Sequence, residues 1–400
     1  MTLAVLFNRL GPYHHARLSA LARQGELTAI EFTTVDNTYA WDLITGKHNY
    51  HVIQVFTDAD IDTKPVSAII KNIRNALSNA SPKVVAIPGW SSTAALAALE
   101  WCCITRTPAI LMSDSTAHDE PRIWWKEWIK SRVVRLFSTA LVAGAPHVDY
   151  ITALGLPRKR VFTGYDVVDN DYFFTQSNNV RAVAPTLRLR HGLPENYFLA
   201  SNRFIEKKNL PRLLDAYAGY VAQVGAGAWS LVLLGDGPQK KRLLDQVARL
   251  GLAGKVLFPG FKQYHELPVF YGLASAFIHA STTEQWGLVV NEAMASGLPV
   301  LVSDQCGCAA DLIHNGVNGF TFNPFDTCSL TKLMLKMGGA ECDLVSMGQA
   351  SRNIIRNQSP QEFAIGMKKA GELALADQAK RPCLLTRLLL LQLIYRKCYN

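Results

Sequence analysis

The chain has 400 residues, 49% hydrophobic and 18% charged, which is typical of a folded globular protein and excludes a disordered one. Its length exceeds the size at which one core usually keeps growing, so two domains are expected. The formal charge of +9 lies mainly in residues 176–400, where 24 Lys and Arg face 16 Asp and Glu. This excess favours an anionic partner, phosphate or a lipid surface rather than DNA, because no nucleic-acid-binding module is visible.

The eight cysteines show no CxxC spacing, which predicts a reduced, cytosolic compartment and argues against a zinc site. The N-terminal apolar run is too short for a signal peptide and predicts a first strand instead. The longest uncharged apolar run lies far below the roughly 20 residues of a membrane span, so any membrane association is expected to be peripheral.

The first half alternates short β-branched apolar runs with longer helical patterns. This alternation is the signature of a parallel sheet covered by helices on both faces. The apolar runs predict six strands, at residues 3–8, 27–34, 51–56, 83–89, 108–114 and 139–144.

The second half resumes this alternation after residues 176–194, which lack periodicity and are expected to form a surface connection between domains. We predict two doubly wound domains, residues 1–175 and 176–378, followed by a basic apolar helix or tail at 379–400. In such sheets ligands bind beyond the carboxyl ends of the strands. The further strands are expected at 197–202, 229–237, 255–260, 275–281, 299–304 and 319–322.

Two segments combine basic and apolar residues. Residues 122–137, "RIWWKEWIKSRVVRLF", predict an amphipathic helix that either lies in a membrane interface and binds lipid phosphate or packs Trp124 and Trp128 into the core. Residues 380–400 hold five basic residues and no acidic one, around "LLTRLLLLQLIYRK". This tail either meets an anionic partner or is a solvated tail packed by its leucines.

The stretch "ASNRFIEKKNLPRLL" ends a strand and opens a helix, with Arg203 and Lys208 five positions apart and Lys207 as a competing candidate. Two cations beside a helix N-terminus suit a pyrophosphate, because their charge adds to the helix dipole and the free amides. A solvated basic loop is the alternative.

The stretch "STTEQWGLVVNEAMASGLPVLVSD" places Glu284 on a loop after a strand and Glu292 about one turn inside the following helix. Gly287 lets the backbone turn between them, and a helix from about 288 to 296 is expected to end at Gly297. The two carboxylates suit recognition of hydroxyl pairs along one extended ligand. The alternative is a helix-capping Glu284 with an exposed Glu292.

Residues 197–325 resemble the C-terminal domain of retaining GT-B glycosyltransferases of the family-4 type. The resemblance rests on "RFIEKKN", "LLGDGP", "VLFPGF", "EQWGLVVNE", "AMASGLPVLVSD" and "GCAADLIHNGVNGF", which occur in family order. It implies two facing Rossmann-like domains, with the donor in the second, the acceptor in the first and the C-terminal helix returning to the first.

The resemblance also implies roles for single residues. Arg203 and Lys208 match the pair that neutralises the donor diphosphate, Glu284 the glutamate that contacts the donor sugar, and Glu292 the one that holds the ribose hydroxyls. Other matched positions contact the base or the phosphate, largely through the backbone: Gly235, Phe261, Lys262, Gly287 and Leu288.

The first half departs from the family pattern. Many relatives have a Gly-Gly loop after the first strand that contacts the donor phosphate. This chain has Gly11 alone as the donor-binding candidate there, before a proline that suits a first helical turn. His14 and His15 follow it and either touch the acceptor or phosphate or lie at the surface of a helix start. Where many relatives place a histidine near the reacting carbon, this chain has Asp114, which either orients the acceptor hydroxyl and accepts its proton or caps the next helix.

The sequence therefore predicts a glycosyltransferase that moves a sugar, with retention, from a nucleotide-diphospho-sugar to a saccharide or lipid-linked saccharide. A role in bacterial envelope polysaccharide or glycolipid synthesis is expected, in the cytoplasm or at the cytoplasmic membrane face. Arg203, Lys208 and helix N-termini are expected to stabilise the leaving diphosphate, so neither a metal nor a cofactor is predicted. The alternatives are a GT-B-type nucleotide-sugar epimerase and a non-catalytic nucleotide-sugar-binding subunit.

Overall fold

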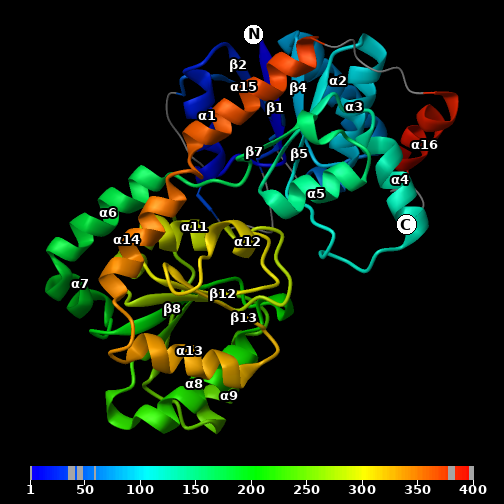
Figure 1. Ribbon diagram of the computed structural model, residues 1–400. Coiled ribbons are helices and arrows are strands. Elements are labelled where there is room, and N and C mark those ends of the chain that lie inside the picture. The colour runs from blue at the N-terminus through cyan, green and yellow to red at the C-terminus, as the bar shows by residue number, and fades with distance from the viewer. Residues whose placement is uncertain (1, 35–40, 43–47, 58–59, 377–382, 396–400) are drawn as a thin grey trace. The chain divides into compact units, whose positions relative to one another are not determined.

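The computed structural model describes residues 2–34, 41–42, 48–57, 60–376 and 383–395. The chain forms two compact units, Met1–Val167 together with Pro360–Asn400, and Val168–Ser359 (Figure 1). In the structure the first unit contains both ends of the chain, and the second unit is one continuous segment. The sequence analysis had placed the domain boundaries after residues 175 and 378.

The first unit contains a seven-stranded sheet with the order β3-β2-β1-β4-β5-β6-β7. Every pairing in it is parallel, as the alternating pattern predicts. The six expected strands are confirmed, and β7 is additional. The strands are Leu3–Phe7 (β1), Leu27–Thr33 (β2), His51–Phe56 (β3), Val84–Pro88 (β4), Ala109–Ser113 (β5), Thr139–Val142 (β6) and Val161–Thr163 (β7).

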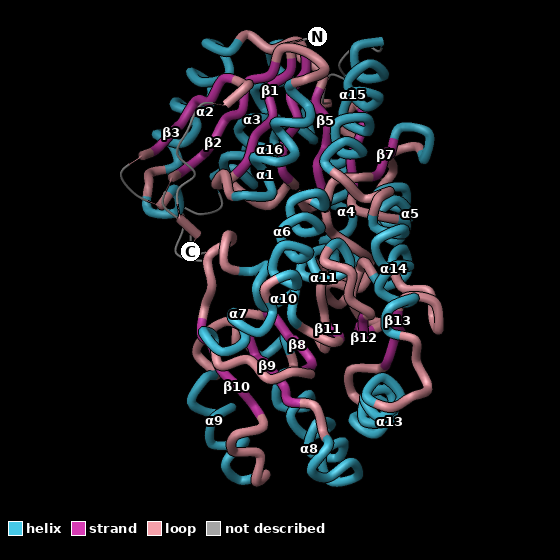
Figure 2. The backbone as a smooth tube through the Cα atoms, turned by 90° about the vertical axis from the view of Figure 1, so that its left-hand side faces the viewer, coloured by secondary structure: helices cyan, strands magenta, loops and turns pink. Residues whose placement is uncertain are grey.

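Helices cover both faces of this sheet (Figure 2). Side chains alternate across β1: Ala4 and Leu6 join one core cluster and Val5 and Phe7 the other, because successive strand residues point to opposite faces. Five helices precede the crossing into the second unit: Pro12–Ala22 (α1), Val66–Ala80 (α2), Thr93–Thr105 (α3), Trp124–Val134 (α4) and Ala145–Ala153 (α5).

The C-terminal segment returns to the first unit. Helix α15 (Pro360–Ala376) packs against α1 and the strands β5 to β7, where Phe363 and Met367 are fully buried. Helix α16 (Leu384–Tyr395) packs on α3. The predicted return of the C-terminal helix to the first domain is confirmed.

The second unit contains a six-stranded parallel sheet with the order β10-β9-β8-β11-β12-β13. The strand order reverses between β8 and β11, and ligands of doubly wound sheets bind at such a switch point. All six strands were predicted: Tyr197–Ser201 (β8), Ser230–Leu234 (β9), Val256–Gly260 (β10), Ala276–His279 (β11), Val300–Ser303 (β12) and Gly319–Phe322 (β13).

The helices of this unit largely follow the predicted pattern. They are Leu210–Val224 (α8), Lys240–Arg249 (α9), Leu267–Leu273 (α10), Leu288–Ala295 (α11), Ala309–Leu312 (α12), Thr327–Gly338 (α13) and Leu344–Ile355 (α14). The expected surface connection at 176–194 is wrong, because Asn170–Ala182 (α6) and Ala184–His191 (α7) are helices. Asp169 caps α6, and Phe173, Ser177 and Val180 form a buried stripe that its many polar residues conceal.

Within the described residues, no helix combines the length and apolar character needed to cross a membrane.

Candidate functional site

The predicted donor-binding residues of the second unit follow the carboxyl ends of its strands. Arg203 comes two residues after β8, Gly235 directly follows β9, and Phe261 directly follows β10. Glu284 follows β11, and the helix that starts at Leu288 carries Glu292. Because β8 and β11 flank the switch point, their loops meet at the place where this fold binds ligands.

Glu284 is the centre of a charged cluster. Its carboxylate accepts a hydrogen bond from the ammonium group of Lys208 and lies 3.7 Å from that of Lys207. Ser281 donates its hydroxyl to the same carboxylate at 3.3 Å, and His279 Nε2 lies 3.5 Å from it. The structure thus joins a loop after β8 to a loop after β11 through opposite charges.

Further hydrogen bonds hold the two loops in place. The side-chain amide of Asn209 donates to the carbonyl oxygen of Ala280 at 3.0 Å, and the backbone N–H of Thr282 donates to that of Lys207 at 2.9 Å. The carbonyl of Glu284 accepts from the N–H of Gly307 at 2.9 Å. Main-chain hydrogen bonds therefore fix the cluster in addition to its charges. The N–H of Gly307 already donates to the carbonyl oxygen of Glu284.

Gly287 lies directly beside this cluster. It precedes α11 with a φ of 105°, a conformation that glycine adopts without strain. A Cβ built on it would lie 3.6 Å from Glu284 Cγ and from His279 Nε2. The start of α11, with Leu288 as its first residue, therefore adjoins the charged cluster.

The electrostatics of the cluster keep Glu284 ionised and His279 neutral. Burial by itself would raise the pKa of Glu284, but the contact with His279 and the charges of Lys208 and Lys207 outweigh it and hold this pKa well below its usual range. Burial lowers the pKa of His279, which is completely enclosed. His279 was not among the predicted site residues, because a histidine inside an apolar strand resembles a core residue.

Glu292 lies inside the unit, with 1% of its surface exposed. The hydroxyl of Tyr271, on α10, donates to its carboxylate at 2.5 Å. Ser201, at the end of β8, neighbours the same hydroxyl. The alternative of a capping Glu284 and an exposed Glu292 is wrong, because Glu292 is buried and the cap residue of α11 is Gly287.

The loop after β8 packs closely on the turn after β9. A Cβ on Gly235 would lie 1.9 Å from the carbonyl oxygen of Asn202, so this position requires glycine. Asn202 is 9% exposed, and neither polar atom of its side chain has a hydrogen-bond partner within the described part of the chain. Buried amides of this kind usually meet a partner, so Asn202 is a candidate ligand contact that the sequence did not reveal.

The remaining predicted position is the turn after β10. Phe261 is 41% exposed there. Lys262 lies 3.5 Å from the carboxylate of Glu266 and over the ring of Phe270. No contact brings these two residues into the Glu284 cluster within the described structure, and their roles stay predictions.

In the first unit, Gly11 caps α1, and its N–H donates to His14 Nδ1 at 3.0 Å. Burial, followed by the charge of Arg17, lowers the pKa of His14 to about 3. His15 stacks on His48 with ring centroids 4.5 Å apart. The two histidines are therefore packed among neighbouring side chains and are not the surface residues expected of a helix start.

Asp114 directly follows β5 in the first unit. Burial raises its pKa, and the charges of His147 and Arg17 partly offset that effect. A carboxyl group with a raised pKa is better suited to accept a proton than an ordinary one. Helix α4 begins only at Trp124 with Ile123 as its cap residue, so the alternative of Asp114 as a helix cap is wrong.

Most of the second unit matches a known protein family. Residues 187–363 match the family described as "Glycosyl transferases group 1". This part of the chain is a group 1 glycosyl transferase domain. The predicted family resemblance, at 197–325, lies within it.

Curated relatives agree with this family. The chain is 27% identical over 221 residues to mannosylfructose-phosphate synthase of Agrobacterium fabrum, covering 53% of this chain and 48% of that protein. It is 31% identical over 144 residues to α-monoglucosyldiacylglycerol synthase of Streptococcus pneumoniae, covering 36% and 32%. The chain thus spans a third to a half of the length of these relatives.

Solved structures extend the likeness to nearly the whole chain. Anabaena HepE in complex with UDP has a TM-score of 0.71 at 19% identity, covering 93% of this chain and 99% of that one. Sucrose-phosphate synthase from Thermosynechococcus elongatus has a TM-score of 0.71 at 16% identity, covering 92% and 97%. Together with the two parallel sheets, these neighbours confirm the GT-B fold.

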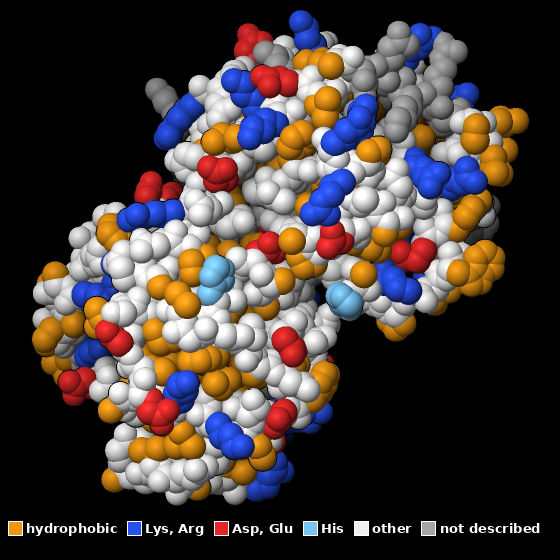
Figure 3. Space-filling view, in the orientation of Figure 1, with side chains coloured by type: hydrophobic (Ala, Val, Ile, Leu, Met, Phe, Trp, Pro, Cys, Tyr) orange, Lys and Arg blue, Asp and Glu red, His pale blue; other side chains and the backbone are white. Residues whose placement is uncertain are grey.

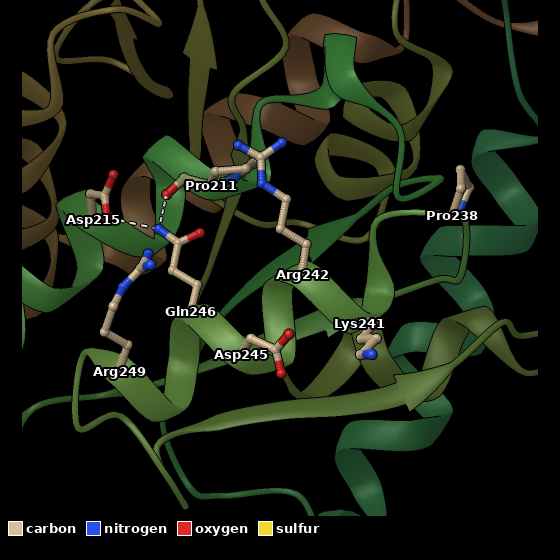
Figure 4. A pocket seen from close by; sticks show the side chains of 8 residues that line it. All are labelled: Pro211, Asp215, Pro238, Lys241, Arg242, Asp245, Gln246 and Arg249. Atoms are coloured by element: carbon tan, nitrogen blue, oxygen red, sulfur yellow. Dashed lines mark hydrogen bonds between the residues drawn. The ribbon is translucent and has the colours of Figure 1, made fainter.

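The group 1 glycosyl transferase domain also carries an open hollow between α8 and α9. Gln246 donates to the carbonyl oxygen of Pro211 at 2.9 Å and to Asp215 at 2.7 Å across its floor (Figure 4). Three basic residues of α9 line the hollow, and none of the predicted donor-binding residues does. The lining residues are Pro211, Asp215, Pro238, Lys241, Arg242, Asp245, Gln246 and Arg249.

Proposed function

We propose that the protein transfers a sugar from a nucleotide-diphospho-sugar to an acceptor hydroxyl. The observation that supports this most directly is the cluster of Lys207, Lys208 and Glu284 at the switch point of a group 1 glycosyl transferase domain. A carboxylate held ionised beside two ammonium groups suits a ligand that carries both sugar hydroxyls and phosphate charge.

The donor diphosphate is proposed to lie between the basic loop and the start of α11. Arg203 and Lys208 supply positive charge, and the backbone N–H groups that follow Gly287 supply donors at a helix N-terminus. Asn202, with its unsatisfied amide, adds a neutral donor and acceptor near Arg203. Glu284 then contacts the sugar, and Glu292 holds the ribose hydroxyls in place of its present bond from Tyr271.

In the proposed step, the bond between the anomeric carbon and the diphosphate oxygen breaks, and the acceptor oxygen bonds to that carbon. The basic groups stabilise the charge that develops on the departing nucleoside diphosphate, without a metal ion in the proposed scheme. Asp114 is proposed to orient the acceptor hydroxyl or to accept its proton. Retention of configuration follows from the family resemblance.

The comparisons support a choice of donor and acceptor class. HepE structures hold UDP, UDP with glucose, and UDP-glucose, so a UDP-sugar is our first candidate. The Streptococcus relative is a glycolipid synthase by name, which supports a saccharide or lipid-linked acceptor and a role in envelope glycolipid or polysaccharide synthesis. A place at the cytoplasmic face of the membrane agrees with that role.

A panel of UDP-, GDP- and ADP-sugars tests the proposal by thermal shift, because a ligand of the folded state raises apparent stability. We expect one nucleotide to raise the unfolding temperature. Glu292→Gln and Arg203→Ala should each weaken its binding by about 10- to 100-fold, as expected for lost hydrogen bonds to charged groups.

Glu341→Gln is the matched control, because Glu341 is an exposed glutamate between α13 and α14 of the same unit. Its variant should bind like the parent. The proposal is wrong if no nucleotide or nucleotide-sugar shifts the transition, or if the control loses as much affinity as Glu292→Gln. Release of an isomerised sugar nucleotide without an acceptor would identify an epimerase, and binding without turnover on any acceptor a non-catalytic subunit.

A further inference from the structure

Helix α4 of the first unit presents aromatic side chains to solvent. Trp124 is 82% exposed, and Trp125 and Trp128 are each 42% exposed. The alternative that Trp124 and Trp128 pack into the core is therefore wrong. Large apolar side chains gathered at a surface mark a place of interaction more often than singly scattered ones.

Helix α16 is apolar on both of its faces, but only one face is covered. Leu390 and Ile394 are buried in the core cluster beneath α3. Leu384, Leu385 and Leu388 on the remaining surface are between 56% and 74% exposed. A helix that is hydrophobic all round is normally buried on every side, so the uncovered leucines call for a partner. The interpretation of a tail packed by its leucines accounts for only half of this helix.

The two exposed faces belong to one surface. Helix α16 contacts α4, and the charge of Arg132 on α4 acts on Cys383, the residue that precedes α16. The same Arg132 lies over the ring of Trp128 at 5.0 Å. Figure 1 shows the two helices at the right edge of the view. Figure 3, in the same orientation, shows hydrophobic and basic side chains gathered at that edge. We call this surface the tryptophan–leucine patch, formed by Trp124, Trp125, Trp128, Leu384, Leu385 and Leu388.

Positive charge surrounds the patch. Lys126 lies over the ring of Trp125, and Arg387 is exposed on α16. Glu127 is the one acidic residue within α4, and it is paired with Arg122 at 3.1 Å and Lys130 at 3.0 Å. Helix α16, from 384 to 395, has no acidic residue. The single carboxylate within the two helices is thus paired, and basic groups remain on both.

We propose that the tryptophan–leucine patch docks the protein on the surface of an anionic lipid bilayer. Tryptophan favours the level of the lipid head groups, where its ring is apolar and its N–H is hydrated. Leucines insert slightly deeper, and lysines and arginines meet lipid phosphates. Helices α4 and α16 then lie along the surface.

A second copy of the chain is a poorer occupant. A two-fold interface places the same patch on both sides, so Lys126, Arg132 and Arg387 would face a surface with the same excess of positive charge. Like charges brought together without partners weaken an interface, and interface cores are generally depleted of charge. An anionic bilayer offers the opposite charge and an apolar interior at once.

Co-sedimentation of the full chain with vesicles tests the proposal. The vesicles contain phosphatidylcholine alone or phosphatidylcholine with phosphatidylglycerol. We expect binding to the phosphatidylglycerol vesicles that weakens with added salt. Trp124→Ser and Leu384→Ser should each weaken binding by about tenfold, in line with the transfer energy of a large apolar side chain.

The matched control is Leu189→Ser, because Leu189 is 87% exposed on α7 of the second unit. It should bind vesicles like the parent. Far-UV circular dichroism checks that all variants are folded, as expected for exposed positions. No sugar donor is present, so the result is independent of the proposed glycosyl transfer.

The proposal is overturned if the parent protein does not bind phosphatidylglycerol vesicles, or if the two patch variants bind them as strongly as the parent does. If light scattering shows a dimer that the patch variants disrupt, and no vesicle binding occurs, the patch is instead an interface between copies of the chain.

Discussion

Glu284 and His279 show how neighbouring groups assign charge within the candidate site. Both are enclosed, yet burial leaves the histidine neutral while the adjoining lysines keep the carboxylate ionised. Because these states are fixed by the folded structure, a diphosphate would enter a field that is already arranged. Such preorganisation is the main way in which a protein stabilises developing charge.

The lowered pKa of His279 predicts a pH-dependent stability. The unfolded chain takes up a proton near the ordinary pKa of 6.5, whereas the folded chain resists it. The contribution of His279 to the unfolding free energy is therefore complete above about pH 6.5 and decreases as the pH falls towards the lowered pKa. Glu284 acts in the same direction only at lower pH, since its ordinary pKa is 4.5.

Urea unfolding at about pH 7 and about pH 5.5 measures this effect, because the two values lie on either side of the ordinary histidine pKa. The parent should lose more stability between the two pH values than His279→Gln does. His51→Gln, at an exposed position at the start of β3, is the control and should lose as much as the parent. Equal losses in the parent and in His279→Gln would contradict the assignment.

The sequence predicted the charged residues of the candidate site but not their neighbours. Glu284, Glu292 and Lys208 stand in ordered motifs after strands, so their positions followed from the pattern. His279 and Tyr271 lie within apolar segments, and Asn202 is an ordinary polar residue at a strand end. Their importance depends on contacts between loops far apart in the chain, which local patterns do not contain.

At the scale of elements, the turn after β9 is predicted to be intolerant of any side chain. Gly235 has a φ of 131°, and an added Cβ would overlap the carbonyl oxygen of Asn202. Because both residues directly follow strands, which limits how far their backbones can move apart, Gly235→Ala should cost at least about 3 kcal/mol of unfolding free energy. It should also displace Arg203 and weaken nucleotide binding.

The variant Gly251→Ala distinguishes the cost of steric overlap from the cost of backbone strain. Gly251 also has a positive φ, 68°, but nothing lies within 4 Å of its Cβ position. Its variant should lose only about 1 kcal/mol, the cost of a left-handed alanine. Urea unfolding compares the two, and similar losses would show that the close approach to Asn202 is unimportant.

Elements with a clear hydrophobic periodicity were predictable from the sequence, and elements that mix polar and apolar residues without such a periodicity were not. All strands of the second unit were expected, because each combines a short apolar run with a turn. Helices α6 and α7 were missed, since the polar composition of α6 outweighs its narrow buried stripe and α7 has no buried residue. The helix around Trp124 was foreseen, but only the structure decides that its tryptophans face solvent.

At the scale of the whole chain, the first unit is completed by a segment that follows the second unit in sequence. Phe363, Met367, Ala370 and Ala374 on α15 are all fully buried in the same cluster as β1 and β5. The hydroxyl of Thr139 on β6 also donates to the carbonyl oxygen of Ala370 at 3.1 Å. Residues 1–167 alone therefore leave part of one face of their sheet uncovered.

A chain that ends at Ser359 is accordingly predicted to lose the first unit. Loss of the Phe363 and Met367 side chains alone should lower the unfolding free energy of the first unit by about 5 kcal/mol or more. This is a large share of the roughly 5–15 kcal/mol that stabilises a domain. We expect binding of a hydrophobic dye and loss of part of the far-UV dichroism, while residues 168–359 retain a cooperative transition. A chain that ends at Ala376 keeps α15 and is the control: it lacks α16 and should unfold at a lower temperature, but still cooperatively. If the chain that ends at Ser359 unfolds at the same temperature as the full chain, α15 is not a structural part of the first unit.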